Sequence, residues 1–191
     1  MVEPRRLHRY TYADYVALEM LSTSKYEFLD GEIYAMAGGS EEHSALAAEM
    51  VRVLGNAVGD RPGRVHTSDL RILVEAVGLA TFPDGSVIRG PLQQHEPSPT
   101  ATALNPMILV EVTSDSSEEY DTGPKLEYYR TIPTLREYVI GSHRERRIIV
   151  NERGTDGVWA TRVATKGGRV EVSSLSADLI VDEIYRNSAV M

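Results

Sequence analysis

Short apolar segments recur along the chain, separated by polar or glycine-containing turns, and they predict a protein rich in β-strands. The strands expected in the centre and toward the end of the chain cover residues 64–68, 70–74, 81–88, 107–113, 135–140, 147–151, 158–164 and 169–172. The first two of these segments can also form one bent strand. Nearer the N-terminus, residues 26–29 and 32–36 flank Asp30 and Gly31, a dipeptide that favours a type I′ turn, so they predict a β-hairpin.

The strongest helical signals lie in the first third of the chain. Thr11 and Asp14 have the spacing of a capping box and predict a helix over residues 12–21. Ser40 is a suitable N-cap for a second helix, in which apolar residues recur at helical spacing until Gly59 ends the pattern.

The second half of the chain predicts two shorter helices and one long loop. The helices are expected near residues 122–131, where Pro124 suits the first turn, and over residues 181–186. Residues 89–105 contain three prolines and few apolar side chains, so they predict an exposed, mobile loop. Helices and strands in this order predict an α/β or α+β fold, and 191 residues suit a single domain, 1–191.

One predicted strand, residues 107–113, carries a charge where an apolar residue is expected. The sequence MILVEVT is otherwise almost wholly apolar, which indicates a strand covered on both faces. Alternation along a strand places Glu111 and Thr113 on the same face. A buried lone carboxylate is unfavourable unless it is paired, neutralised or bound to a metal. Glu111 is therefore a candidate functional residue, and the alternative is a pair with a core arginine, either Arg71 or Arg136.

Two further residues, Asp84 and Lys125, are expected near Glu111. Asp84 lies in a predicted strand that can pair with the strand of Glu111, and Lys125 lies at the start of the helix that follows Glu111. Two carboxylates and a lysine suit Mg²⁺-dependent phosphodiester hydrolysis, in which the lysine orients or deprotonates water. The alternatives are a Pro-Asp-Gly turn for Asp84 and a solvated helix residue for Lys125. Other acidic residues of this region are predicted to lie on the surface or to cap helices: Asp69, Glu75 and Asp121.

The composition of the chain indicates where the protein is located and which partners its surface can bind. The sequence has no cysteine, no apolar segment long enough to span a membrane and no secretory signal, so we expect a cytoplasmic protein. A net charge of −8 argues against a broad basic surface for nucleic acid. A local basic patch is an alternative, formed either by Arg61, Arg64 and Arg71 or by residues 143–147.

A set of segments occurs in a characteristic order along residues 11–187. They are YEFLDGEIYAMAG with a following His43, then SDLRILV, FPDGSVI, ILVEVTSDSSEEYDTGPKLEYYRTI and PTLREYVI. Together they resemble the Uma-type restriction endonuclease family, within the PD-(D/E)XK nuclease superfamily. The resemblance implies a mixed β-sheet flanked by helices, in a restriction-endonuclease-like core with a metal site at the edge of the sheet.

The resemblance also implies roles for individual residues. Asp84 corresponds to the aspartate of the "PD" element and Glu111 to the second acid, so both are expected to bind Mg²⁺ or Mn²⁺. Thr113 stands where the superfamily has a lysine, and members of the family supply this lysine from the next helix, at the position of Lys125. Glu27 corresponds to a further acid near the site, which binds metal or holds a bound water.

These roles predict an endonuclease that acts on nucleic acid, with DNA as the expected substrate. A homodimer is expected, because cutting two strands favours two-fold symmetry. The alternative is a catalytically inactive protein of the same fold that acts as a nucleic-acid-binding or assembly module. Other hydrolase classes gain no support, since the sequence contains no G-x-S-x-G, P-loop, H-E-x-x-H or EF-hand motif. His43, near a helix start, is expected to cap the helix or support the site rather than bind zinc.

Overall fold

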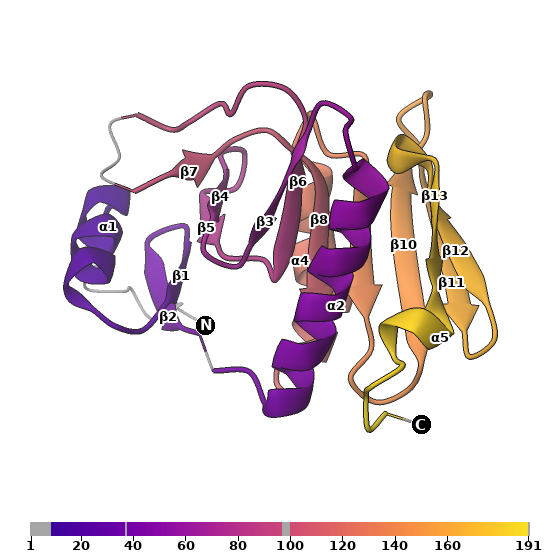
Figure 1. Ribbon diagram of the computed structural model, residues 1–191. Coiled ribbons are helices and arrows are strands. Elements are labelled where there is room, and N and C mark those ends of the chain that lie inside the picture. The colour runs from indigo at the N-terminus through magenta and orange to yellow at the C-terminus, as the bar shows by residue number, and fades with distance from the viewer. Residues whose placement is uncertain (1–8, 37, 97–99, 191) are drawn as a thin grey trace, which may run out of the picture.

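A six-stranded sheet forms the centre of the protein, with helices on both of its faces (Figure 1). The computed structural model describes residues 9–36, 38–96 and 100–190. The strands of this sheet are β3 (Arg64–Thr67), β6 (Gly85–Ile88), β8 (Pro106–Val112), β9 (Glu137–Gly141), β10 (Arg147–Arg153) and β11 (Trp159–Thr165). They lie in the order β11-β10-β9-β8-β6-β3. Since β8 and β9 are parallel and the other neighbours antiparallel, the sheet is mixed, as predicted.

Two smaller sheets complete the strand content of the described residues. The five-stranded sheet has the order β2-β1-β5-β4-β7 and contains β1 (Tyr26–Leu29), β2 (Glu32–Ala35), β4 (Arg71–Val74), β5 (Leu79–Thr81) and β7 (Thr102–Ala103). β1 and β2 form the predicted hairpin, and both turn residues, Asp30 and Gly31, have positive φ, as a type I′ turn requires. A two-stranded sheet joins β12 (Arg169–Val172) to β13 (Ala177–Ile180).

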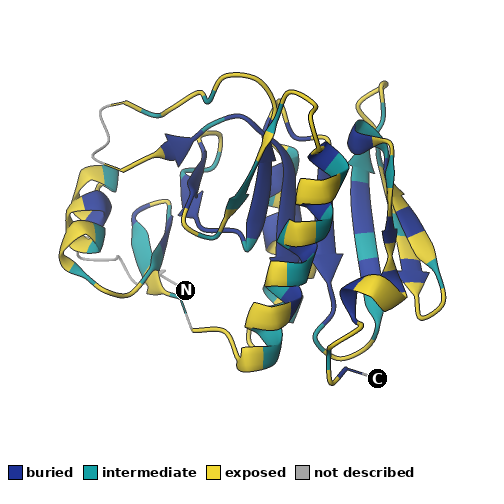
Figure 2. Cartoon of the chain, in the orientation of Figure 1, coloured by how far each residue is buried: buried dark blue, intermediate teal, exposed yellow. Residues whose placement is uncertain are grey.

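Helix α2 (Glu41–Val58) covers one face of the six-stranded sheet, and α4 (Pro124–Arg130) lies behind the other (Figure 1). The side chain of Ser40 caps α2 and Gly59 ends it, as predicted. The buried face of α2 packs against β6 and β8 through Leu46, Met50, Leu54 and Val58. Figure 2 shows the contrast between this helix, exposed on its outer side, and the buried strands behind it.

Strand β8 is buried along its whole length, because it is covered on both faces. The predicted alternation is confirmed: Ile108 and Val110 pack in the same cluster as α2, whereas Leu109 packs with Leu126 and Tyr129 of α4. The face that carries Leu109 also carries Glu111, so Glu111 is directed toward α4 and not toward α2.

The remaining helices are short, apart from α1 (Tyr12–Leu21), whose capping box of Thr11 and Asp14 is formed as predicted. The others are α3 (Glu118–Thr122), the 3₁₀ helix η1 (Ser173–Leu175) and α5 (Val181–Ile184). The helix predicted near residues 122–131 is α4, with Pro124 in its first turn as expected, whereas α3, which precedes it across Gly123, was not predicted. Within the described residues, no helix is long and apolar enough to cross a membrane.

The strand predicted over residues 81–88 is wrong as a single element. It is divided into β5 and β6, which belong to different sheets, and Phe82, Pro83 and Asp84 connect them. Pro83 has no N–H group to donate to a strand ladder, which favours a break at this point. The alternative of one bent strand over residues 64–74 is also wrong, because β3 and β4 join different sheets.

The prediction of an exposed loop over residues 89–105 is wrong for its last part. β7 lies in this segment and pairs in parallel with β4, and Gln94 forms an isolated bridge with Ala103. Thr102, Ala103 and Asn105 are buried. Residues 97–99 lie outside the described residues. β13, which pairs with β12, was not predicted from the sequence.

Candidate active site

Glu111 lies near the end of β8 and forms a buried ion pair with Lys125. Its side chain is on the α4 face of the sheet, and the residue is only 5% exposed. The Nζ atom of Lys125 lies 2.7 Å from Oε1 of Glu111, and the hydroxyl of Tyr129 donates a hydrogen bond of 2.9 Å to the same oxygen. The predicted partner of Glu111 was either this lysine or a core arginine. The structure shows Lys125, since Arg71 pairs with Glu19 and Arg136 is exposed.

Lys125 contacts further carboxylates from two other elements. Its Nζ atom lies 3.4 Å from Oδ1 of Asp121 and 3.9 Å from Oε2 of Glu27. Pro124 occupies the first turn of α4, and Lys125 follows it in the same turn, directed at the sheet. The rings of Tyr120 and Tyr129 lie within cation–π distance of the ammonium group. Lys125 is therefore a buried, fully partnered cation, and the alternative of a solvated helix residue is wrong.

Asp84 occupies the break between β5 and β6 and is joined to β8 by hydrogen bonds. Its Oδ2 atom accepts a hydrogen bond of 2.7 Å from the backbone N–H of Val112, and its own N–H donates at 3.4 Å to Oε2 of Glu111. Asp84 does follow a proline, at a bend in the chain between β5 and β6. Its carboxylate nevertheless reaches the end of β8, beside Glu111.

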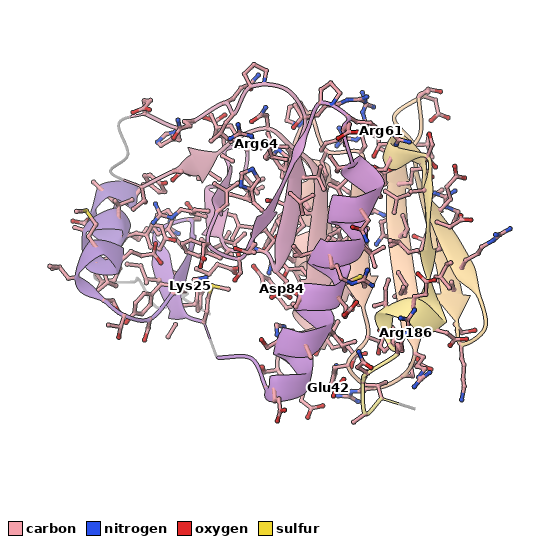
Figure 3. All side chains as sticks on the ribbon, viewed as in Figure 1. Lys25, Glu42, Arg61, Arg64, Asp84 and Arg186 are labelled. Atoms are coloured by element: carbon pink, nitrogen blue, oxygen red, sulfur yellow. The ribbon has the colours of Figure 1, made fainter. Side chains whose placement is uncertain are left out.

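His43, in the first turn of α2, lies on the other side of Asp84. Its Nε2 atom is 3.2 Å from Oδ2 of Asp84, and its backbone N–H donates to the capping side chain of Ser40. The hydrogen bond to Asp84 raises the pKa of His43, although burial opposes this. The expectation that His43 supports the site agrees with this contact. Figure 3 shows Asp84 beside the lower half of α2, toward the end that carries Glu42.

Glu27 reaches the site from β1 of the smaller sheet. Its Oε2 atom accepts a hydrogen bond of 2.6 Å from Thr81, and its Oε1 atom accepts one of 2.5 Å from Tyr120. With Lys125 on its third side, the carboxylate is fixed in place and only 8% exposed. All four candidate residues from the sequence, Glu27, Asp84, Glu111 and Lys125, thus lie together although they come from four different segments.

Three site residues were missed by the sequence analysis. Asp121 was predicted to lie on the surface or to cap a helix, but it is 2% exposed and pairs with Lys125. Tyr120 and Tyr129 hold the carboxylates of Glu27 and Glu111. A signal for two of them was present, because Asp121, Lys125 and Tyr129 recur at intervals of four residues and so share a helical face. Asp69 and Glu75, in contrast, are exposed, as predicted.

The site has more buried acid than its single lysine can neutralise. Burial raises the pKa of Glu111, and the nearby carboxylates of Asp84 and Asp121 add to the rise, whereas Lys125 opposes it. Burial also raises the pKa of Asp121. For Lys125, burial disfavours the charged form, but the carboxylates of Glu111, Asp121 and Glu27 outweigh this effect and raise its pKa. The cluster therefore has excess negative character, which favours the binding of a cation.

A cavity of about 900 Å³ opens over these residues. Glu27, Asp84, Glu111, Asp121 and Lys125 all line it, together with His43. Residues 113–117, which follow β8, and His143 also form part of its wall.

Thr113 and His143 are hydrogen-bonded to each other in that wall. The hydroxyl of Thr113 lies 2.7 Å from Nδ1 of His143, and Nε2 of His143 lies 3.0 Å from Oδ1 of Asp115. Thr113 is 1% exposed, so its hydroxyl is committed to this network. Thr113, at the position where the resemblance would place a lysine, thus has a structural role here.

Neither of the two basic patches considered from the sequence surrounds the cavity with unpaired positive charges. Arg71 is buried, and Arg61 donates a hydrogen bond to the carbonyl of Leu175. Figure 3 shows Arg61 and Arg64 toward the end of α2 opposite to Glu42, away from Asp84. In the 143–147 segment only His143 lines the cavity, and Arg144 pairs with Asp115 at 2.9 Å.

Comparison with known proteins agrees with the resemblance seen in the sequence. A family model described as "Uma2: Putative restriction endonuclease" matches residues 12–181. Two relatives from Synechocystis sp., the uncharacterized proteins slr1290 and sll1609, are each 32% identical to the chain; the alignments cover 92% and 85% of this chain and 91% and 92% of theirs.

A solved structure shares the fold. It is the crystal structure of "a putative nuclease belonging to DUF820 from Anabaena variabilis", which is 19% identical. The two structures align with a TM-score of 0.70 over 90% of this chain and 97% of the other. The predicted restriction-endonuclease-like architecture, a mixed sheet flanked by helices, is confirmed by this likeness. Because the family model spans nearly the whole chain, the protein belongs to the Uma2 family of restriction endonuclease-like proteins.

Proposed function

We propose that the protein is a metal-dependent endonuclease that hydrolyses phosphodiester bonds of nucleic acid in the cavity. The observation that carries this proposal is the position of Lys125, whose Nζ atom lies 2.7 Å from Glu111 although Thr113 occupies the usual lysine position. An ammonium group beside the second acid is thus supplied from α4, and Asp84 lies next to the same acid. Membership of the Uma2 family supports the nuclease class.

The donor groups of the site fit Mg²⁺ or Mn²⁺. Asp84 and Glu111 would hold the ion, since both line the cavity and an Asp84 oxygen is already directed at the end of β8. Among the described residues, no group of three or more His, Cys, Asp or Glu side chains is arranged to hold a metal. A site of only two carboxylates suits Mg²⁺, which retains several waters and binds substrate phosphate, better than zinc. When bound there, such an ion would supply positive charge beside the phosphate and lower the pKa of water that it coordinates.

The protein side chains perform the positioning in this proposal. Lys125 orients the attacking water and stabilises negative charge that develops on the phosphate. Deprotonation of the water by Lys125, the other role considered for it, is disfavoured because its carboxylate partners raise its pKa and keep it an ammonium. Tyr129 holds the carboxylate of Glu111 by a hydrogen bond, and Glu27 lies against the ammonium group of Lys125. Both contacts help to fix the position of the Glu111–Lys125 pair. His43 holds the Asp84 carboxylate from α2. Positioning of this kind accounts for much of the rate in phosphoryl transfer.

A cleavage assay with matched variants tests the proposal. Purified protein is incubated with single-stranded and duplex DNA and with RNA, in Mg²⁺ or Mn²⁺ and in chelator. We expect metal-dependent cutting that falls by at least about 100-fold in Asp84→Asn and in Glu111→Gln. The control is Glu137→Gln, which alters a carboxylate that is equally buried but lies outside the cavity lining, on β9.

The possible results separate the candidates clearly. If Asp84→Asn and Glu111→Gln cut as fast as the parent protein, the site assignment is wrong. If the parent binds nucleic acid but cuts no substrate with either metal, the protein is an inactive binding module instead. DNA as the substrate, homodimeric assembly and a cytoplasmic location stay predictions; light scattering of the purified protein tests the assembly.

A further inference from the structure

One wall of the cavity is apolar and lies next to the acidic cluster. It is formed by Leu29, Tyr34, Ala35, Met36 and Phe82. The residues of this apolar wall differ in exposure: Tyr34 is 48% exposed, whereas Phe82 is only 8% exposed. The apolar wall thus includes one accessible aromatic ring, that of Tyr34, and one buried ring, that of Phe82.

The register of the β1–β2 hairpin places this wall beside the candidate active site. Tyr34 is the direct cross-strand partner of Glu27, and Leu29 lies two residues beyond Glu27 on the same strand. Opposite residues of an antiparallel pair point to the same face, as do residues two apart on a strand. Tyr34 and Leu29 therefore share the face of the hairpin from which Glu27 reaches Lys125. In Figure 1, the chain continues from β2 to the first turn of α2, where His43 contacts Asp84.

The charge around the cavity is unsuited to a duplex held by its phosphates. Duplex binding depends largely on lysine and arginine side chains that neutralise phosphates. The described lining residues contain no arginine, and their one lysine, Lys125, is buried among carboxylates. Near the hairpin, Lys25 pairs with Asp69 at 2.9 Å and Arg9 with Asp30 at 3.2 Å. The chain as a whole has a net charge of −8.

Single strands are bound in a different way. Their unpaired bases stack on aromatic side chains, and this stacking is largely independent of sequence. A cavity of about 900 Å³ has the size of a pocket for a small molecule, so it admits one or a few nucleotides and not a duplex. A base against the apolar wall would place the adjoining sugar and phosphate near the acidic cluster, because Tyr34 is the cross-strand partner of Glu27.

We propose that the cavity takes an unpaired base of a single-stranded nucleic acid against the apolar wall, with Tyr34 as the stacking residue. This inference rests on the proposed nuclease function and names its substrate class. Single strands, overhangs and frayed ends are then the substrates, and continuous duplex is a poor one.

Binding and cleavage are measured separately on the same oligonucleotides. A single strand with one 2-aminopurine, and its duplex, are titrated with protein in Ca²⁺, and gels verify that the oligonucleotide stays intact. We expect the single strand to bind at least about tenfold more tightly than the duplex and its 2-aminopurine signal to be quenched by stacking.

Variants of Tyr34 test the apolar wall itself. Tyr34→Ala is expected to weaken single-strand binding by about 5- to 100-fold, and Tyr34→Trp to retain it, because tryptophan also stacks. The matched control is Tyr10→Ala, which removes a tyrosine of similar exposure, 47%, that does not line the cavity. This control is expected to bind like the parent protein.

The outcomes distinguish this inference from the proposed function. If Tyr34→Ala binds the single strand as tightly as the parent, or if neither form of DNA or RNA binds, the inference is overturned. If duplex is bound and cut as well as single strand, the inference also fails, while the nuclease function stands. If the single strand binds through Tyr34 but is never cut in Mg²⁺ or Mn²⁺, the nuclease function fails and the base-binding inference survives.

Discussion

Replacing Lys125 with methionine is the most direct test of how the acidic cluster is held together. Methionine keeps most of the apolar stem and removes the ammonium group. Three carboxylate oxygens then lose their common partner, which lies 2.7 Å from Glu111, 3.4 Å from Asp121 and 3.9 Å from Glu27. All of these residues are buried, so water cannot readily replace the lost charge.

The size of the effect follows from the balance of attraction and desolvation. At an effective dielectric constant of about 20, unit charges at these three separations attract by about 6, about 5 and about 4 kcal/mol. Loss of hydration of the ammonium group and the carboxylates offsets much of this gain. Removal of one partner from a buried ion pair destabilises proteins by about 3–5 kcal/mol, and we expect a loss of this size for Lys125→Met.

The loss is expected to depend on pH in a defined direction. Burial already raises the pKa of Glu111 and of Asp121 in the folded protein. Without Lys125 both pKa values rise further in the folded state and stay unchanged in the unfolded state. The folded variant therefore binds protons more tightly than the folded parent, and its deficit in stability grows as the pH rises from about 5 to about 8.

Chemical denaturation in the presence of chelator measures this deficit. The parent, Lys125→Met, Glu111→Gln and the double variant are unfolded in urea at about pH 5 and about pH 8. The double variant is expected to be more stable than the sum of the single losses predicts, by about 1–3 kcal/mol. Lys166→Met, at an exposed lysine, is the control. A deficit below about 1 kcal/mol near pH 8, or one that does not shrink near pH 5, refutes the argument.

Three further predictions follow from the site and its support. Asp84→Asn is expected to abolish the stabilisation that saturating Mg²⁺ or Mn²⁺ gives the parent, about 3 kcal/mol at a hundredfold excess over the dissociation constant; an unchanged rise in Tm contradicts this. Arg71→Met is expected to lower stability by about 3–5 kcal/mol in urea titration, because Arg71 forms a buried pair with Glu19; a loss below about 1 kcal/mol contradicts it. Thr113→Lys is expected to restore part of the cleavage lost in Lys125→Met. If no cleavage returns in the double variant, an ammonium group beside Glu111 is not by itself what cleavage requires.

Local sequence signals predicted the elements that depend on local chemistry. The helix 12–21 and its capping box are formed, and α2 begins after Ser40 and ends at Gly59. The hairpin turns at Asp30 and Gly31. These features are set by side chains that bond to backbone groups a few residues away, or by backbone conformations that few residues adopt. They can therefore be recognised without knowledge of the rest of the chain.

Features that depend on distant partners were predicted less well. The division of residues 81–88 into β5 and β6 is decided by which sheet each half joins, and β7 exists because β4 offers a parallel partner. The buried position of Asp121 likewise depends on Lys125, whose ammonium group is held in place by Glu111 from β8. No local pattern contains this information, although the four-residue interval between Asp121 and Lys125 indicates a shared face.

The sequence has a threonine, Thr113, where a lysine is expected two residues after Glu111. The structure nevertheless brings an ammonium group to Glu111, that of Lys125. Thr113 follows directly after the end of β8, and its hydroxyl is held by His143. Lys125 approaches the carboxylate of Glu111 from α4, the helix that packs across the face of the sheet that carries Glu111. The proposed chemistry needs an ammonium group next to Glu111, and it does not need that group to come from the same strand. The fold can therefore exchange one segment for another as the source of the lysine, provided that both end at the same point above the sheet.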